Sequence, residues 1–161
     1  MQKKYLAFLF LYFILCPLFA SSFTQNISCK KINYLAGVIY SEACGEKYNG
    51  KKLVATVIWI RSNQDPENIY RVITLPKQFA HPKYNKDKEW DKCFELANKL
   101  YNDTFDPSTI VLKNGKKVMP DHFFSGKIPW WAKGKEYRIV EGLKFLELGS
   151  YRGKIHENSC F

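Results

Sequence analysis

The 161-residue sequence lacks the patterns that usually bind metal ions or nucleic acids. It has no Cys-x-x-Cys pair, and its histidines, His81, His122 and His156, are scattered. The signal for a metal site is therefore weak, and no cofactor is expected. It contains no RNA- or DNA-binding motif, so no nucleic-acid partner is expected. Internal repeats, low-complexity tracts and linkers are also absent, which is typical of a single domain.

Acidic residues are scarce relative to basic ones. The chain has 25 Lys and Arg against 15 Asp and Glu, which gives a formal net charge of +10 at pH 7. A basic protein is drawn to polyanions, such as anionic cell-wall polymers, lipid headgroups and nucleic acids, and the charge alone does not choose among them. The lysine pairs at 30–31, 51–52 and 116–117 are interpreted as solvated faces.

The longest apolar run stands at the N-terminus, over residues 5–20. Two lysines precede it and small residues follow at 20–22, which is the pattern of a secretory signal peptide over residues 1–22. The run is shorter than the roughly 20 apolar residues of a membrane span. We therefore expect cleavage before Phe23, export to the periplasm, cell wall or medium, and no stable membrane insertion afterwards; a retained anchor is the alternative.

Removal of these 22 of the 161 residues leaves 139, enough for one domain with its own core. It also removes two lysines and no acid, so the net charge falls from +10 to +8. Four cysteines remain, and an even number in an exported protein permits three disulfide pairings. Cys29 and Cys160 are expected to join the ends, and Cys44 to pair with Cys93. Buried free thiols are the alternative.

The spacing of apolar residues predicts helices in the first two thirds of this domain. Apolar positions at i, i+3, i+4 and i+7 indicate a helix over residues 32–42, which Gly45 ends. A second helix, ending at Arg61, has apolar residues on nearly all sides and is expected to be central and buried. Residues 69–74 are compatible with a short helix or strand after a loop at 63–68. A third helix is expected over 90–101.

The last third of the chain favours β structure. Residues 109–112 and 116–119 flank Asn114-Gly115, a strong signal for a hairpin turn. Residues 121–131 are expected to form an aromatic-rich loop, and residues 139–148 are ambiguous. Helices first, then a hairpin and a short sheet, predict a small single-domain α+β fold.

Two carboxylates lie where the first predicted helix ends. Glu42 and Glu46 are four residues apart, at a point where we expect a buried helix to meet a cleft. Partial burial disfavours the charged form and raises the pKa of a carboxyl group. A carboxyl group that is still protonated near neutral pH is what a glycosidase uses as its general acid. The alternative interpretation is that both are solvated charges at a helix end.

Several short motifs occur in a particular order around these glutamates. Residues 40–46 match a core motif, Tyr-Gly-Glu-Ala-Arg-Gly-Glu, at five positions. Ser41 stands in place of the first Gly of this motif, and Cys44 stands in place of its Arg. The other segments are a glycine-then-helix stretch from Gly50 to Arg61, Pro76-Lys77-Gln78-Phe79-Ala80, Trp90 with Ala97, Asp106-Pro107-Ser108, His122-Phe123-Phe124, and Pro129-Trp130-Trp131-Ala132. With these motifs, residues 33–148 resemble the SleB/CwlJ-like cell-wall hydrolases, which include spore-cortex-lytic enzymes.

The resemblance implies a lysozyme-like α+β fold and an enzyme that cleaves the glycan strands of peptidoglycan. Members of the family resemble lytic transglycosylases or muramidases with one essential glutamate, which by position is Glu42. Most glycosidases need two carboxyl groups across the scissile bond. Only Glu42 can be named here, with Asp106 and Asp121 as other acids near expected cleft loops, so a single-acid mechanism is expected. Its product would be a 1,6-anhydro sugar, whereas attack by water would give plain hydrolysis.

Substrate contacts are assigned to six residues: Tyr40, Glu46, Gln78, Phe79, His122 and Trp131. The Gln78 amide suits sugar hydroxyl or acetamido groups. The aromatic rings suit stacking on sugar faces, although aromatic side chains more often belong to the core. His122 is placed to contact substrate or to influence the protonation of Glu42. Loop or core roles are the alternative for each of them.

The expected partners are peptidoglycan glycan strands and anionic wall polymers, with the chain acting as a monomer. One alternative is a non-catalytic exported wall or glycan binder on the same fold, but a pure binder has no need of Glu42. Another is a small basic membrane-active protein. That alternative predicts a strongly amphipathic basic helix, and none is evident after residue 22.

Overall fold

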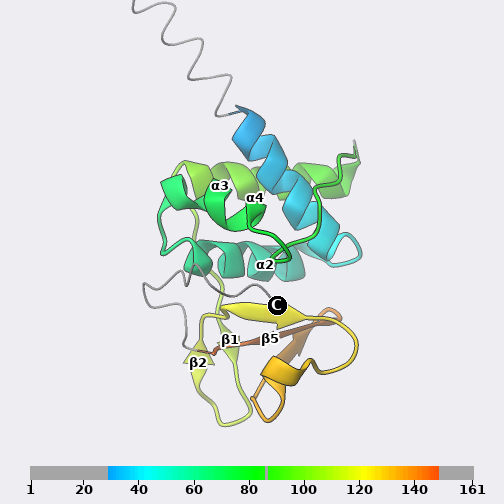
Figure 1. Cartoon of the computed structure of the whole chain (residues 1–161), viewed down its shortest axis with the longest axis vertical. Coiled ribbons are helices and arrows are strands. Elements are labelled where there is room, and N and C mark those ends of the chain that lie inside the picture. Colours follow the sequence, from blue (N-terminus) through cyan, green and yellow to red (C-terminus); the bar gives the residue numbers. More distant parts are fainter. Residues whose placement is uncertain (1–28, 86, 149–161) are drawn as a thin grey trace, which may run out of the picture.

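The computed structural model describes residues 29–85 and 87–148. The predicted signal peptide and Cys160 lie outside these residues. In the described part, helices come first and short antiparallel strands follow (Figure 1), which confirms the predicted small α+β class. Within that same part, every helix is too short or too polar to cross a membrane.

The helical part is built from a first helix at residues 29–43 and from α2 (Tyr48–Arg61), α3 (Pro66–Thr74) and α4 (Lys88–Tyr101). The segment left open between helix and strand is the helix α3. It begins inside the loop that was expected at 63–68, because Asp65 caps it by accepting a hydrogen bond from the Glu67 N–H at 2.9 Å. Pro66 then occupies the first helical position, where its missing N–H costs nothing.

Helix α2 is the centre of the molecule. It packs against α3 and α4 on one side and reaches β3 of the sheet on the other, so it lies between the helical and β parts (Figure 1). Residues 53–59 are all buried, which explains why its apolar pattern showed no polar face. The prediction of a central buried helix is confirmed.

Lys51 of α2 corrects the interpretation of the lysine pairs as solvated faces. Its side chain is fully buried, whereas the neighbouring Lys52 is partly exposed. The Lys51 ammonium forms an ion pair with Glu89 of α4 at 2.8 Å and donates a hydrogen bond to the backbone carbonyl of Glu46. A buried charge needs such partners, and here they tie α4 to the turn that follows the first helix.

The β part contains two small antiparallel sheets. Strands β1 (Ile110–Val111) and β2 (Lys117–Val118) form the hairpin predicted around Asn114-Gly115. Strands β3 (His122–Phe124), β4 (Arg138–Val140) and β5 (Leu143–Leu146) form a second sheet in the order β3-β5-β4. The ambiguous segment at 139–148 therefore supplies most of β4 and the whole of β5, which Glu141 and Gly142 join in a turn with positive φ at both residues.

Strand β3 lies inside the stretch that was expected to be an aromatic loop. Its partner is β5, with Phe123 opposite Phe145, and this pairing joins segments about 20 residues apart. A short aromatic run forms a strand only when such a distant partner supplies the hydrogen bonds, which local sequence does not reveal. Phe145 is fully buried and belongs to the same core as the helices, so the sheet is packed firmly under α2.

We expect Lys51→Met to destabilise the fold by about 2 kcal/mol, because it leaves the Glu46 carbonyl without its donor and Glu89 without its buried partner. Lys52→Met in the same helix turn is the matched control. Its partner Asp106 is exposed, so the change should cost less than about 0.5 kcal/mol. Urea unfolding of the variants measures both effects, and equal costs for the two would contradict the role given to Lys51.

Candidate active site

Glu42 lies in the last turn of the first helix and reaches into a pocket between the helices and the sheet. Tyr40, two residues before it, and Ala43, directly after it, are buried, while Ser41 and Glu42 itself are partly exposed. The pocket has a volume of about 220 Å³. It is lined by Glu42, Arg61, Gln78, Phe123, Phe124, Ser125 and Leu143.

The Glu42 carboxyl group experiences opposing influences. Burial in the pocket is the larger one and raises its pKa above the usual 4.5. A hydrogen bond from the Ala80 N–H, 2.5 Å from Glu42 Oε1, and the positive charge of Arg61 favour the carboxylate and lower the pKa. The net shift is upward. The Glu42 carboxyl group therefore keeps its proton to a higher pH than an ordinary glutamate does. When it ionises, the Ala80 N–H and the charge of Arg61 stabilise the carboxylate.

Arg61 lines the Glu42 pocket, although the sequence analysis did not assign it to a site. It ends α2 and is buried, with Nε donating to the Asp121 carbonyl at 2.9 Å and Nη1 donating to Gln78 Oε1 at 3.2 Å. Its guanidinium also lies 5.3 Å from the centre of the Phe79 ring. A signal existed in the sequence, because Arg61 is a lone cation at the end of an apolar helix and must find acceptors when buried.

The loop after α3 is held against the first helix, and this contact places the Ala80 N–H on Glu42. The Lys83 N–H donates to the Gly37 carbonyl at 3.2 Å and to Ser41 Oγ at 2.9 Å, and Ser41 Oγ lies 2.7 Å from the His81 carbonyl. Ser41 is one of the two departures from the core motif. Its hydroxyl forms hydrogen bonds with the backbone of the loop that also places the Ala80 N–H on Glu42.

The three-stranded sheet supplies the opposite wall of the pocket. Phe123 and Phe124 of β3, Ser125 after them and Leu143 of β5 all line it. The Phe123 ring lies 6.4 Å from that of Phe79, so aromatic packing connects the loop to the sheet. The surface that the pocket exposes is mostly polar, and Ser125 adds a hydroxyl from this wall, which suits a ligand with hydrogen-bonding groups.

His122 and Trp131, both predicted to contact substrate, lie outside the set of residues that line the pocket. His122 Nδ1 is 2.8 Å from Asp121 Oδ1, and the buried Asp121 side chain also accepts the Leu148 N–H at 2.9 Å. Trp131 packs 5.4 Å from the His122 ring and 5.7 Å from the Phe124 ring. In this arrangement His122 belongs to β3 itself, and Trp131 packs on two rings of that strand.

Tyr40 and Glu46 were also assigned to substrate, and the structure places both away from the pocket lining. Tyr40 donates to Asp87 Oδ2 at 2.9 Å and accepts from Asn85 at 2.8 Å, which fastens the first helix to the start of α4. The first helix ends before Glu46, so Glu46 does not extend the helix face of Glu42. Its carboxylate lies against Gly142, and its Oε2 has no hydrogen-bond partner among the described residues.

The cysteines of the described part, Cys29, Cys44 and Cys93, are free thiols in the structure. Burial raises the pKa of the Cys93 thiol to about 12. The expected pairing of Cys44 with Cys93 stays a prediction, and the partner expected for Cys29 lies outside the described residues. Within residues 29–85 and 87–148, no group of three or more His, Cys, Asp or Glu side chains is placed to hold a metal ion.

We expect Gly37→Ala to displace the loop from the first helix. An added Cβ would lie 2.7 Å from Pro82 Cβ and 3.1 Å from the Lys83 carbonyl, which is too close without movement. The cost should be about 1–3 kcal/mol in unfolding free energy, together with a shift of the Ala80 amide NMR signal. Gly45→Ala is the control, because no atom lies within 4 Å of its added Cβ. An unshifted Ala80 signal in the Gly37 variant would contradict the role of this contact.

We expect Glu42→Gln to stabilise the protein in a pH-dependent way. Because the folded pKa of Glu42 is raised, the folded state binds the proton more tightly than the unfolded state, and stability falls as pH rises through the folded pKa. The variant should therefore unfold like the wild type at about pH 3 and be the more stable protein at about pH 8. Urea unfolding at both pH values tests this, with the exposed Glu67→Gln as control; a pH-independent difference would contradict it.

Searches with known protein-family models, curated proteins and solved structures found no match to this chain. The resemblance to the SleB/CwlJ-like hydrolases therefore stays a prediction from its motifs, and the function rests on the chemistry of the pocket.

Proposed function

We propose that the protein is an enzyme that cleaves the glycosidic bond between N-acetylmuramic acid and N-acetylglucosamine in peptidoglycan, with Glu42 as general acid and base. The observation that carries this proposal is the state of Glu42. Its carboxyl group is partly buried in a pocket, its pKa is raised by that burial, and a backbone N–H and Arg61 oppose the shift. A carboxyl group whose pKa is raised by burial, with groups beside it that stabilise its anion, suits acid–base catalysis.

The pocket supports a mechanism with one carboxyl group. Glu42 is the sole carboxylate among the described residues that line it. The two other acids considered for the site are engaged elsewhere: Asp121 holds His122 and the Leu148 N–H, and Asp106 pairs with Lys52. Since inverting and retaining glycosidases normally place a second carboxyl group across the bond, a lytic transglycosylase is the better fit.

In this mechanism, the protonated Glu42 donates its proton to the glycosidic oxygen as the C1–O bond breaks. The substrate's own acetamido group stabilises the positive charge that develops at C1. The Glu42 carboxylate, held by the Ala80 N–H and the charge of Arg61, then takes the proton of the C6 hydroxyl. The C6 oxygen attacks C1 and closes a 1,6-anhydro ring, which leaves Glu42 protonated for the next cycle.

Substrate binding is proposed to depend mainly on the polar groups of the pocket. Gln78 and Ser125 offer hydrogen-bonding groups, and Phe123 forms part of the wall beside them. Gln78 is itself oriented by the hydrogen bond from Arg61, so its position depends on the same cation that acts on Glu42. Phe79 contributes through its packing on Arg61 and Phe123.

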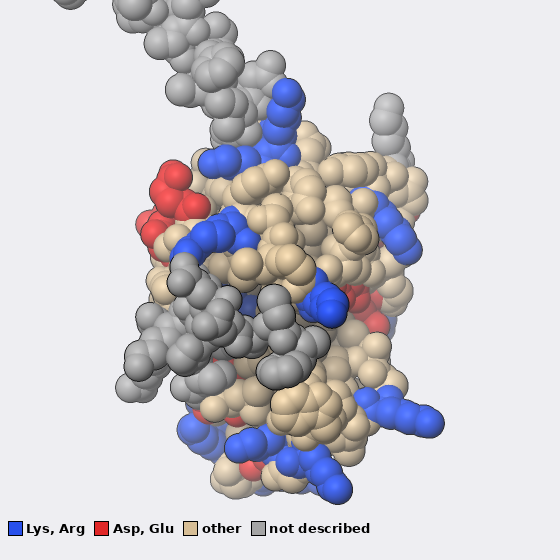
Figure 2. Space-filling view, viewed as in Figure 1, with Lys and Arg blue, Asp and Glu red and all other residues tan. Residues whose placement is uncertain are grey.

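Export to the wall and attraction to anionic wall polymers complete the proposal. The predicted signal peptide supplies the route, and the net charge of +8 that remains after its removal (+10 − 2) supplies the attraction. Figure 2 shows Lys and Arg side chains spread over both the helical and the β parts, with several gathered at the lower end over the β part. Such a distribution allows weak contacts with a polyanion from many orientations.

The test is digestion of purified peptidoglycan, with mass spectrometry of the products of the wild type and of Glu42→Gln. We expect anhydro-muropeptides from the wild type and a loss of at least about 100-fold in the variant, the usual contribution of a general acid. Reducing-end products that depend on Glu42 would instead indicate a hydrolase with a second catalytic group. Absence of cleavage by the wild type, where a control enzyme cleaves, would favour a non-catalytic binder.

A further inference from the structure

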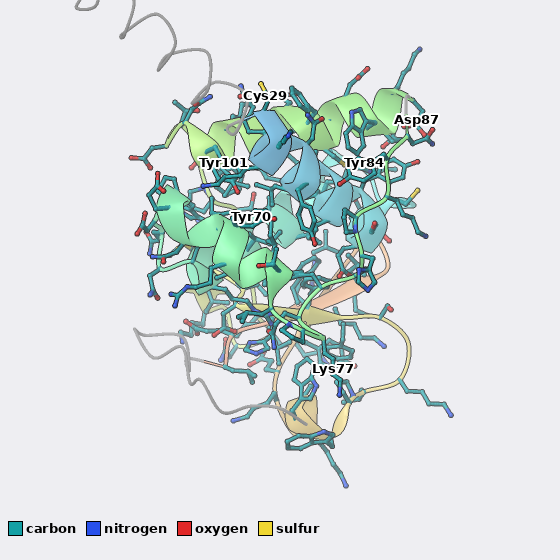
Figure 3. The ribbon with its side chains drawn as sticks, turned by 45° about the horizontal axis from the view of Figure 1, so that its top comes forward. Cys29, Tyr70, Lys77, Tyr84, Asp87 and Tyr101 are labelled. Atoms are coloured by element: carbon teal, nitrogen blue, oxygen red, sulfur yellow. The ribbon has the colours of Figure 1, made fainter. Side chains whose placement is uncertain are left out.

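A second and larger hollow lies along the N-terminal part of the first helix, away from the Glu42 pocket. It measures about 490 Å³ and is flanked by α3 and by the segment before α4. Its lining residues, here called the tyrosine groove, are Lys30, Lys31, Asn33, Tyr34, Tyr70 and Tyr84. Figure 3 looks onto this side of the molecule, with Tyr70 on α3 and Tyr84 on the other side of the first helix.

The groove presents aromatic surface to solvent in a fixed arrangement. Tyr34 and Tyr70 pack edge to face with ring centres 5.5 Å apart, and the Tyr84 ring lies 5.8 Å from that of Trp90. Tyr70 nevertheless remains 40% exposed and Tyr84 62% exposed. Grouped, exposed aromatic residues mark ligand-binding surfaces, and tyrosine provides rigid contact area that loses little conformational entropy on binding.

The charge of the groove has one sign. Two lysines line it and no acidic side chain stands among its described lining residues. The Lys31 ammonium lies 6.0 Å from the centre of the Tyr70 ring, so positive charge and aromatic surface meet at one place. Asn33 adds an amide, which donates to the Cys29 carbonyl at 2.9 Å. The complementary ligand has flat apolar faces, polar edges and negative charges.

We propose that the tyrosine groove is an accessory binding site for an acidic glycan, a chain of sugar rings whose substituents carry carboxylates. The rings would stack on Tyr70 and Tyr84, and the carboxylates would pair with Lys30 and Lys31. Naming peptidoglycan as that glycan rests on the proposed function. Catalysis at Glu42 does not require the groove, which instead keeps the polymer at the enzyme between cuts.

The groove and the Glu42 pocket share structural supports. The segment that gives the Ala80 N–H to Glu42 runs on through Lys83, which is bonded to Gly37, and reaches Tyr84 in the groove. Tyr34 and Glu42 stand eight residues apart on the same helix, about 12 Å along its axis. One polymer strand is long enough to occupy both sites.

The test measures binding of the protein to insoluble peptidoglycan in a Glu42→Gln background, in which cleavage is removed. Adding Tyr70→Ala with Tyr84→Ala should weaken binding by at least about tenfold, the effect of losing two ring contacts, while Tyr70→Phe with Tyr84→Phe should stay within about twofold. Lys30→Gln with Lys31→Gln should weaken binding more than the matched exposed pair, Lys133→Gln with Lys135→Gln. Circular dichroism checks that each variant is folded; if the alanine variant is not, the lysine comparison decides.

The proposal is overturned if the folded alanine variant binds like its parent, or if the two lysine pairs have equal effects. It is also overturned if the protein binds phosphatidylglycerol vesicles through these residues and leaves peptidoglycan unbound. Cleavage by the wild type is scored separately. Tyrosine-dependent binding without cleavage would support the groove and overturn the proposed enzyme, whereas cleavage with tyrosine-independent binding would overturn the groove alone.

Discussion

The burial of one positive charge, on Arg61, organises the candidate active site. A guanidinium group removed from water must find acceptors, and the groups around this one come from three different parts of the chain. The Asp121 carbonyl stands at the start of the sheet, and Gln78 and Phe79 lie on the loop after α3. Glu42 lies on the first helix, and the charge of Arg61 lowers its pKa. Helices, loop and sheet therefore meet around a single side chain, and the pocket is the space that remains between them.

The same arrangement balances the protonated form of Glu42 against its ionised form. Full burial without partners would keep the carboxyl group protonated, and full pairing with Arg61 would keep it ionised. Arg61 directs its Nε and Nη1 hydrogen bonds to other acceptors, and a backbone N–H supplies the hydrogen bond to Glu42. The Glu42 carboxyl group thus combines burial, which favours its protonated form, with a nearby cation and an N–H donor, which favour its ionised form.

Ser41 and Lys51 illustrate how far local sequence can be interpreted. Ser41 looked like a plain departure from a motif, and Lys51 looked like half of a solvated lysine pair. The structure gives each of them a buried or partly buried hydrogen-bond role, Ser41 at the loop and Lys51 at the turn before α2. Neither role could be predicted, because Lys83, the partner of Ser41, and Glu89, the partner of Lys51, lie on segments that approach only when the chain is folded.

The sequence by itself determined the α+β class, the first helix with its glutamate at the end, the buried central helix and the hairpin at Asn114-Gly115. These follow from periodicity and turn chemistry, which act between near neighbours. Tertiary structure alone decided that β3 is a strand, that Arg61 belongs to the site, and that His122, Trp131 and Tyr40 support the surroundings of the pocket and do not line it. Burial and hydrogen bonding between distant segments settle such questions, since they depend on which surfaces meet.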